Sequence, residues 1–518
     1  MPKTILIFSD GTGQLGGLRP DQRLSNVYKM YRATRPGPDS PINPKAQVAF
    51  YDAGLGAGEV GGITFKRVRN VMAAAVGTGI DENVIDCYAA IVARYEPGDR
   101  ICIFGFSRGA YTARSLTNVL NLCGVPTHNE KGALVPRFGP ELRAIASDAV
   151  RNVYNHGAGA KRARYETERE TLAARFRDRH GSHGVGVDGE GQGNVQPTFV
   201  GVFDTVAALG SRTATTIAFV GMAALIAISI YVWRHAPWWV AVPVAALPLS
   251  AGYWFVRSFW SQVKFFADDA KSRLSRWDPR RQWFELRHAH VAWWSGKNYD
   301  RYADKEVGHL RHALAIDEDR AKFPRVAWGS SADLQWHKAR GRENWLVQVW
   351  FAGNHSDIGG SYPEEESRLS DIALRWMVGE LKQALGDEVA VLDDRLVTSP
   401  DALGLQHSER TGMLNGQPAW FRLLTFGKVV WAKAKRDVDP EATLHPTVLE
   451  RLAAPHVPQM GEVRPYRPES LSGHVAAKGF YGANSLIDGA ADAVAGAKGD
   501  EPSAAALAQP TDAGRQTP

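Results

Sequence analysis

Short uninterrupted runs of apolar residues recur along this chain of 518 residues, and each run ends in glycine, proline or polar residues. Such runs are typical of strands that are buried on both faces of a parallel sheet. We therefore predict strands at 4–9, 46–56, 100–106, 198–210 and 345–353.

Between these runs, apolar residues are spaced three and four positions apart. This spacing predicts helices at 81–95, 108–124 and 369–385. A charged helical stretch is expected at 140–178, followed by a glycine-rich loop at 180–196. Because strands alternate with helices, the pattern indicates an α/β fold with a mainly parallel sheet.

The longest apolar stretches lie near the middle of the chain. Ile217–Trp233 and Ala236–Val256 contain no charged residue, and only Arg234 and His235 separate them. Each stretch falls within the roughly 17–25 residues that a helix needs to cross a bilayer. We predict an inserted transmembrane helical hairpin; a hairpin lying in one leaflet and a helical pair buried in a soluble core are the alternatives. Aromatic residues suited to a membrane interface flank it at Tyr231, Trp233, Trp238, Trp239, Tyr253 and Trp254.

Basic residues are distributed unequally around this hairpin. The connection between the two stretches carries only Arg234, whereas five basic residues follow the second stretch. The positive-inside bias therefore favours a cytoplasmic position for the globular part. The segment after the hairpin is also aromatic, which suits contact with an anionic membrane surface. The five basic residues are Arg257, Lys264, Lys271, Arg273 and Arg276.

The pattern divides the chain into four parts. Residues 1–210 form the first part of the core, with a helical insertion at about 140–196, and 211–275 form the hairpin with its basic amphipathic exit segment. Residues 276–488 form the second part of the core. The tail at 489–518 is rich in Ala, Gly, Asp and Pro without periodicity, and is expected to be disordered.

Composition and charge bear on which partners and which compartment are expected. The net charge of +6 is small for this length, and no long basic run contains interleaved aromatic residues, so a nucleic-acid partner is not expected. Three cysteines cannot build a disulfide framework, which favours a reducing compartment. The N-terminus begins a strand almost at once and lacks the features of a secretory signal peptide.

The stretch Gly105-Phe106-Ser107-Arg108-Gly109 has the pattern G-x-S-x-G. A predicted strand precedes it and a predicted helix follows it, which is the setting of a nucleophile elbow, so Ser107 is the expected nucleophile. The backbone amide of Arg108 would lie at the helix N-terminus, where it can stabilise an oxyanion. A second oxyanion donor is expected from Asp10 and Gly11, which follow the first strand.

A serine nucleophile needs a histidine base and a carboxylate that orients it, in the chain order Ser, acid, His. This order favours Asp357 as the acid and His445 as the base. His355 is a second candidate for the base or for a neighbouring group. Asp204 ends a strand and is expected to support the site.

Two pairs of histidines, His288 with His290 and His180 with His183, lack an accompanying set of carboxylate or Cys ligands at metal-binding spacing. The first pair is interpreted as part of a strand and the second as part of a loop. The predicted mechanism requires no metal and no organic cofactor.

Seven motifs follow one another along the chain: IFSDGTGQ, YDAGLGAG, YEPGDRICIFGFSRGAYTAR, GVFDTVAALG, RHALAIDEDRAKFPRVAW, VQVWFAGNHSDIGGSY and LHPTVLERL. In this order they resemble the motifs of a known family, the uncharacterised α/β-hydrolase family that includes the first class of type VI secretion phospholipase effectors. The resemblance implies an α/β-hydrolase-like fold and a Ser-Asp-His phospholipase or lipid esterase, with Ser107, Asp357 and His445 as the triad.

Together these observations predict a membrane-associated serine hydrolase that cleaves lipid esters, with membrane lipid as substrate and the bilayer as partner. A bacterial inner-membrane location is expected, and delivery to a target cell as an effector is the alternative, with a secretion apparatus or an immunity protein as further partners. A non-lipid esterase, and a membrane-anchored or pore-forming toxin whose hydrolase fold is not its main activity, are the alternative functions.

Overall fold

The structure is a computed structural model, and it describes most of the chain. The predicted tail at 489–518 lies outside the described residues, as does the part of the predicted Asp10–Gly13 turn after Gly11. The described residues are 2–11, 23–53, 79–206, 212–292, 301–321, 323–410, 412, 423, 431–459 and 461–481.

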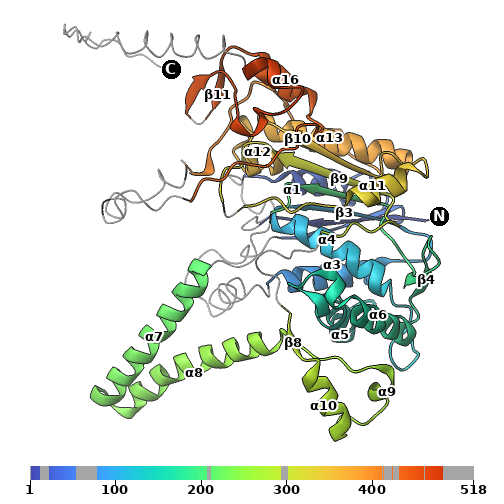
Figure 1. Cartoon of the computed structure of the whole chain (residues 1–518), viewed down its shortest axis with the longest axis vertical. Coiled ribbons are helices and arrows are strands. Elements are labelled where there is room, and N and C mark those ends of the chain that lie inside the picture. The colour runs from blue at the N-terminus through green and yellow to red at the C-terminus, as the bar shows by residue number, and fades with distance from the viewer. Residues whose placement is uncertain are drawn as a thin grey trace, which may run out of the picture.

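A six-stranded sheet forms the centre of the molecule (Figure 1). Its order is β10-β9-β6-β3-β1-β2, and every neighbouring pair is parallel. The prediction of an α/β fold with a mainly parallel sheet is therefore confirmed. The strands are β1 (Thr4–Ser9), β2 (Gln47–Asp52), β3 (Arg100–Phe106), β6 (Phe199–Phe203), β9 (His309–Ala315) and β10 (Leu346–Phe351).

Strand β9 was not predicted, because polar residues interrupt its apolar pattern. Arg311 and His312 are both buried in the sheet. The Arg311 guanidinium donates to Glu380 Oε2 at 2.5 Å, and His312 Nε2 accepts from the Thr205 amide at 3.3 Å. These partners satisfy polar groups that would otherwise be costly to bury inside a sheet.

Helices cover both faces of the sheet (Figure 1). Ile5 and Ile7 belong to one core with α3 and α4, and Leu6 and Phe8 belong to the opposite core with α1 and α13. This alternation follows from the two-residue period of a strand, and burial of each such side chain contributes about 1.5–3 kcal/mol. The helices are α1 (Asn26–Thr34), α3 (Gly79–Arg94), α4 (Arg108–Cys123) and α13 (Arg368–Leu385).

The predicted charged helical stretch is divided into shorter helices, and the loop predicted at 180–196 instead contains a small antiparallel hairpin. Gly193 packs closely in this hairpin, since a Cβ atom there would lie 2.1 Å from the carbonyl oxygen of Leu120. The elements are α5 (Pro140–Asp148), η1 (Ala149–Val153), η2 (Tyr154–Gly157), η3 (Arg162–Arg164), α6 (Glu166–His180), β4 (His183–Val185) and β5 (Gly191–Gly193).

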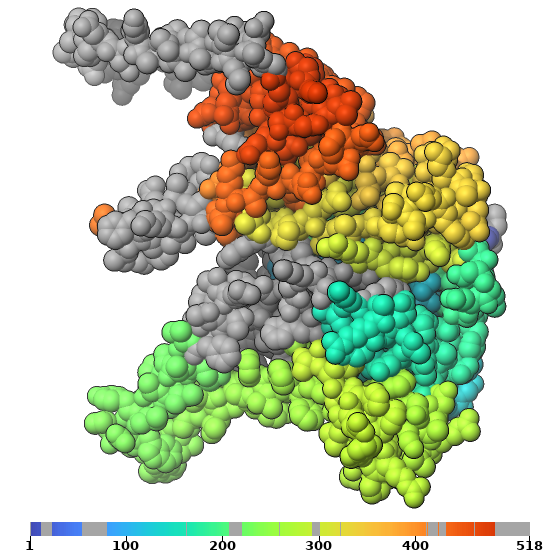
Figure 2. Space-filling view, viewed as in Figure 1, coloured from blue at the N-terminus to red at the C-terminus, as the bar shows by residue number. Residues whose placement is uncertain are grey.

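Helices α7 (Arg212–His235) and α8 (Trp238–Trp260) form a hairpin that projects from the globular part (Figures 1 and 2). Its apolar side chains are exposed, including Trp238 at 77% and Leu249 at 74%. The alternative of a helical pair buried in a soluble core is therefore wrong. Among the described residues, only Trp238–Arg257 is long and apolar enough to cross a membrane.

The chain returns from the hairpin through β7 (Val263–Lys264) and β8 (His290–Val291), which pair antiparallel. The short helices α9 (Asp269–Ser272) and α10 (Pro279–Arg287) lie between these strands. The remaining elements are α11 (Ser331–Lys338), α12 (His355–Gly359), η4 (Glu364–Glu366), η5 (Gly386–Glu388), η6 (Asp393–Arg395), α16 (Pro446–Ala453), β11 (Val457–Gln459), β12 (Glu462–Arg464), η7 (Glu469–Leu471) and η8 (Lys478–Tyr481).

Candidate active site

Ser107 occupies a sharp turn between β3 and α4. Its backbone has φ 59° and ψ −119°, a conformation that is strained for a residue with a side chain. The flanking glycines make the turn possible, because neither position has room for a side chain. A Cβ atom on Gly105 would lie 2.2 Å from the carbonyl oxygen of Gly109, and a Cβ atom on Gly109 would lie 2.0 Å from the carbonyl oxygen of Ser9. The strand, the strained serine and the helix have the strand–turn–helix geometry of a nucleophile elbow, and this turn is called the elbow below.

Asp204 follows β6 directly and is fully buried. Its Oδ2 accepts from His355 Nδ1 at 2.6 Å and from Arg436 Nη2 at 2.8 Å, and its Oδ1 accepts from the Ala315 amide at 3.1 Å. Burial alone would raise the pKa of Asp204, but the charge of Arg436 and the interaction with His355 outweigh this effect and hold the pKa well below its ordinary value. Asp204 is therefore an anion at neutral pH.

His355 is the first residue of α12, and its imidazole packs against the elbow. Its ring centroid lies 4.7 Å from that of Phe106, the residue that precedes Ser107. Nδ1 is paired with Asp204, whereas Nε2 is buried and has no hydrogen-bond partner among the residues that the structure describes. A carboxylate that orients an imidazole through Nδ1 is one of the two contacts of a general-base histidine.

Asp357 is also in α12, but it is paired with a histidine that sequence reasoning missed. Its Oδ1 lies 2.7 Å from His407 Nδ1, and its Oδ2 accepts from the amides of Asn354 at 3.0 Å and His407 at 3.1 Å. His407 Nε2 lies 3.2 Å from Glu366 Oε2. Burial would lower the pKa of His407, but Asp357 and Glu366 outweigh it and raise the pKa. The group joins the loop that carries His407 to α12.

His445 lies elsewhere and does not make the predicted bond to Asp357. It caps the N-terminus of α16, where its Nδ1 lies 2.8 Å from Thr447 Oγ1, and its ring stacks on Phe351 at 4.7 Å. Burial lowers the pKa of His445. The structure therefore pairs Asp357 with His407 in place of the expected His445.

The residues predicted to bind the oxyanion lie beside Ser107. Arg108 is the first residue of α4, so its amide is at the helix N-terminus. A Cβ atom at Gly11 would be 3.5 Å from the Ser107 Cβ. However, the Asp10 amide donates to the Asp52 carbonyl at 3.0 Å, and the Gly11 amide donates to Asp10 Oδ1 at 2.7 Å. These bonds engage both amides.

The Asp10 carboxylate has its own set of partners beneath the elbow. Its Oδ2 accepts from the hydroxyl groups of Ser25 and Tyr51. Burial raises the pKa of Asp10 to about 6, and the hydrogen bonds from Ser25, Tyr51 and Gly11 act in the opposite direction. Asp10 therefore serves as an acceptor that holds the end of β1 against neighbouring side chains.

A group of side chains that could hold a metal ion lies apart from Ser107. Among the described residues, His156, Glu168 and His290 form a group with ligand atoms close enough to hold a metal ion. Of the pair assigned to a strand, His290 lies in β8 as predicted, whereas His288 follows the last residue of α10 and lies outside the strand. The loop prediction for the other pair is wrong, because His180 ends α6 and His183 begins β4.

The fold defines the class of this protein as an α/β protein with a strained serine, Ser107, in the turn at the carboxyl end of a strand of a parallel sheet. The chain belongs to the family described as T6SS, Phospholipase effector Tle1-like, catalytic domain, whose model matches residues 3–237 and 275–380. This match confirms the resemblance to type VI secretion phospholipase effectors. Ser107, Asp204 and His355 lie inside the matched ranges, whereas His407, Arg436 and His445 lie outside them.

Other similarities are more limited. The uncharacterized protein YEL023C of Saccharomyces cerevisiae is 28% identical over 130 residues, which are 24% of this chain and 18% of that protein. The chain therefore spans less than a fifth of the length of this relative. A crystal structure of an uncharacterized protein from Pseudomonas aeruginosa has 14% identity and a TM-score of 0.34, covering 77% of this chain and 48% of the other.

Proposed function

We propose that the chain hydrolyses an acyl ester of a membrane phospholipid with Ser107 as nucleophile, His355 as base and Asp204 as the orienting acid. The observation that carries this proposal is the 2.6 Å contact between Asp204 Oδ2 and His355 Nδ1, beside a strained elbow serine. The chain order Ser, Asp, His agrees with that of an α/β hydrolase. This assignment replaces Asp357 and His445 in the triad.

In the proposed reaction, Ser107 Oγ attacks the ester carbonyl while His355 Nε2 accepts the hydroxyl proton. The Arg108 amide stabilises the oxyanion, and Asp204 stabilises the imidazolium that forms. His355 then gives its proton to the leaving alcohol, which departs as the lysophospholipid. Water, deprotonated by His355, releases the fatty acid from Ser107 and restores the serine hydroxyl.

Asp357 and His407 have a supporting role in this scheme. Asp357 is two residues from His355 on the same short helix, and its bonds to the Asn354 and His407 amides hold that helix. A small displacement of a catalytic group lowers the rate strongly, so a fixed α12 supports catalysis.

The exposed hairpin would bring this site to its substrate. The Trp238–Arg257 segment has a mean hydropathy of 1.5, and 6% of it is buried. Exposed apolar surface of this extent marks an interaction site, and a bilayer matches the length of α8. Family membership supports delivery to a target cell, where the hairpin would enter the target membrane.

The experiment compares fatty-acid release from phosphatidylethanolamine and phosphatidylglycerol vesicles with hydrolysis of a soluble short-chain ester. We expect the wild type to release fatty acid, and Ser107→Ala to lose that activity while retaining its thermal unfolding temperature. Equal release by Ser107→Ala would refute the proposed chemistry. If the protein hydrolyses the soluble ester and releases no fatty acid from the vesicles, its substrate is a non-lipid ester.

A further inference from the structure

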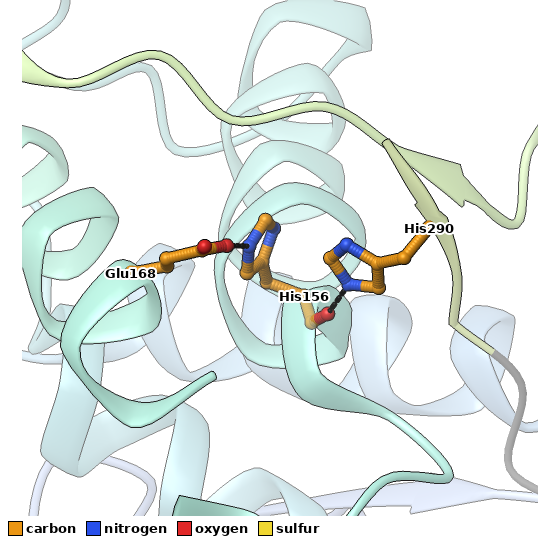
Figure 3. A group of neighbouring side chains, drawn as sticks. All are labelled: His156, Glu168 and His290. Carbon is orange, nitrogen blue, oxygen red and sulfur yellow. Dashed lines mark hydrogen bonds and ion pairs between the residues drawn. The ribbon is translucent and has the colours of Figure 1, made fainter. Parts of the chain in front are cut away.

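Three side chains with metal-binding atoms meet where the chain returns from the hairpin to the globular part (Figure 3). His156 comes from η2, Glu168 from α6 and His290 from β8. Their ligand atoms all lie within 4.8 Å of one another. Because His290 is more than a hundred positions from the other two in the sequence, only the folded chain assembles this group.

The orientation of His290 leaves one ring nitrogen suited to a cation. Its Nε2 donates to the His156 carbonyl oxygen at 2.6 Å, and a neutral imidazole has only one N–H, so Nδ1 carries a lone pair. A backbone carbonyl that accepts from the second ring nitrogen is the usual partner of a metal-binding histidine. The ring of Tyr165 stacks on His290 at 3.9 Å and fixes its plane.

The surroundings of His290 Nδ1 also favour a positive charge. The carbonyl oxygen of His288 lies 3.2 Å from this nitrogen. A lone pair that faces a carbonyl oxygen at this distance is unfavourable, unless a proton or a cation lies between or beside the two atoms. A metal ion bound at Nδ1 would remove this repulsion.

His156 and Glu168 supply the other two donors. His156 Nε2 lies 2.7 Å from Glu168 Oε2, and the His156 side chain is 1% exposed, against 21% for Glu168. Two ligands of a tetrahedral zinc ion are about 3.4 Å apart. To bind zinc together with His156, the more exposed Glu168 must therefore move its carboxylate away from His156 Nε2 by less than about 1 Å.

We propose that His156, Glu168 and His290 bind a divalent transition-metal ion of the zinc class, with water as the fourth ligand. Two histidines and one carboxylate form a donor set that zinc accepts in tetrahedral sites. The positive charge of the nearby Lys264 would repel the ion, and the negative charge of Asp81 offsets the charge of Lys264. The ion would join β8 to η2 and α6 and so fix the base of the hairpin to the globular part.

The test is a calorimetric titration of the full chain with zinc chloride at pH 7.5, together with the unfolding temperature at each zinc concentration. We expect saturable binding of one ion and a higher unfolding temperature. Glu168→Gln keeps the shape of the side chain, and His290→Ala removes a ligand; each should weaken the binding by more than about 10-fold. The matched control is His288→Ala, which changes the neighbouring histidine outside the group and should bind zinc as the wild type does.

Three results would overturn the proposal. The first is the absence of saturable binding to the wild type. The second is unchanged zinc affinity in both Glu168→Gln and His290→Ala. The third is equal loss of affinity in His288→Ala. Circular dichroism without zinc must show the same folded spectrum for all four proteins, and Glu168→Gln provides the comparison if His290→Ala does not fold. The outcome does not depend on lipid hydrolysis.

Discussion

Asp204 and His355 share a hydrogen bond of 2.6 Å between Oδ2 and Nδ1, although 150 residues separate them along the chain. The parallel sheet explains this contact. Phe106 and Phe203 are register partners in β3 and β6, so the residues that follow them, Ser107 and Asp204, leave adjacent strands side by side. His355 then needs only to approach from the loop after β10 to complete the site.

Arg436 should stabilise the fold through Asp204. Both side chains are buried, and removal of one partner from a buried ion pair costs about 3–5 kcal/mol. We expect Arg436→Met to lower the free energy of unfolding by this amount and Arg436→Lys to restore part of it, as measured by urea denaturation. The neighbouring Lys435→Met is the control, since its exposed pair with Glu469 is worth less than about 1 kcal/mol. Equal losses in the two methionine variants would contradict this role.

The bond between Asp357 and His407 should make stability depend on pH. The pKa of His407 in the folded chain is raised above its ordinary value of 6.5, so its stabilising effect is complete below that pH and is lost as the pH rises through the folded pKa. We expect His407→Asn to lower the unfolding temperature more at pH 6 than at pH 9. The exposed His456→Asn serves as control. A loss that is independent of pH would show that His407 acts only through its backbone and packing.

The exposed leucines of α8 should determine membrane binding. Leu247 is 55% exposed and Leu249 is 74% exposed, so two lysines at these positions would place charge inside the hydrocarbon core. We expect Leu247→Lys with Leu249→Lys to reduce co-flotation with vesicles by at least about 10-fold, while hydrolysis of a soluble ester is unchanged. Leu134→Lys changes an exposed leucine of the globular part, at 87%, and should float as the wild type does. Unchanged flotation of the double variant would exclude insertion of this helix.

The elbow could be predicted from the sequence because all its determinants are local. Glycines at fixed offsets, an apolar run before them and a helical pattern after them are sufficient to place Ser107. The strands at 4–9 and 100–106 were equally clear, since both are buried on two faces and carry few polar residues.

The proposed partners of Ser107 could not be assigned from the sequence, because their choice depends on the order of strands in space. Strand β9 lies between β6 and β10, and its histidines and arginine conceal its pattern. Without β9, the sequence does not show that the loop after β10, which carries His355, lies close to the end of β6. Asp204 and His355 were therefore second choices. His407 and Arg436 come from segments without periodicity, and only the folded chain shows that they bind Asp357 and Asp204.

The most direct test of the proposed triad is the rate at which a fluorophosphonate probe labels Ser107 in His355→Asn and in His445→Asn at pH 7.5. Labelling requires an activated serine hydroxyl and does not require a known lipid substrate. We predict that His355→Asn labels at least about 100-fold more slowly than the wild type, because a positioned base contributes about 10²–10⁴ in rate, and that His445→Asn labels at the wild-type rate. Rapid labelling of His355→Asn together with loss of labelling in His445→Asn would contradict the account.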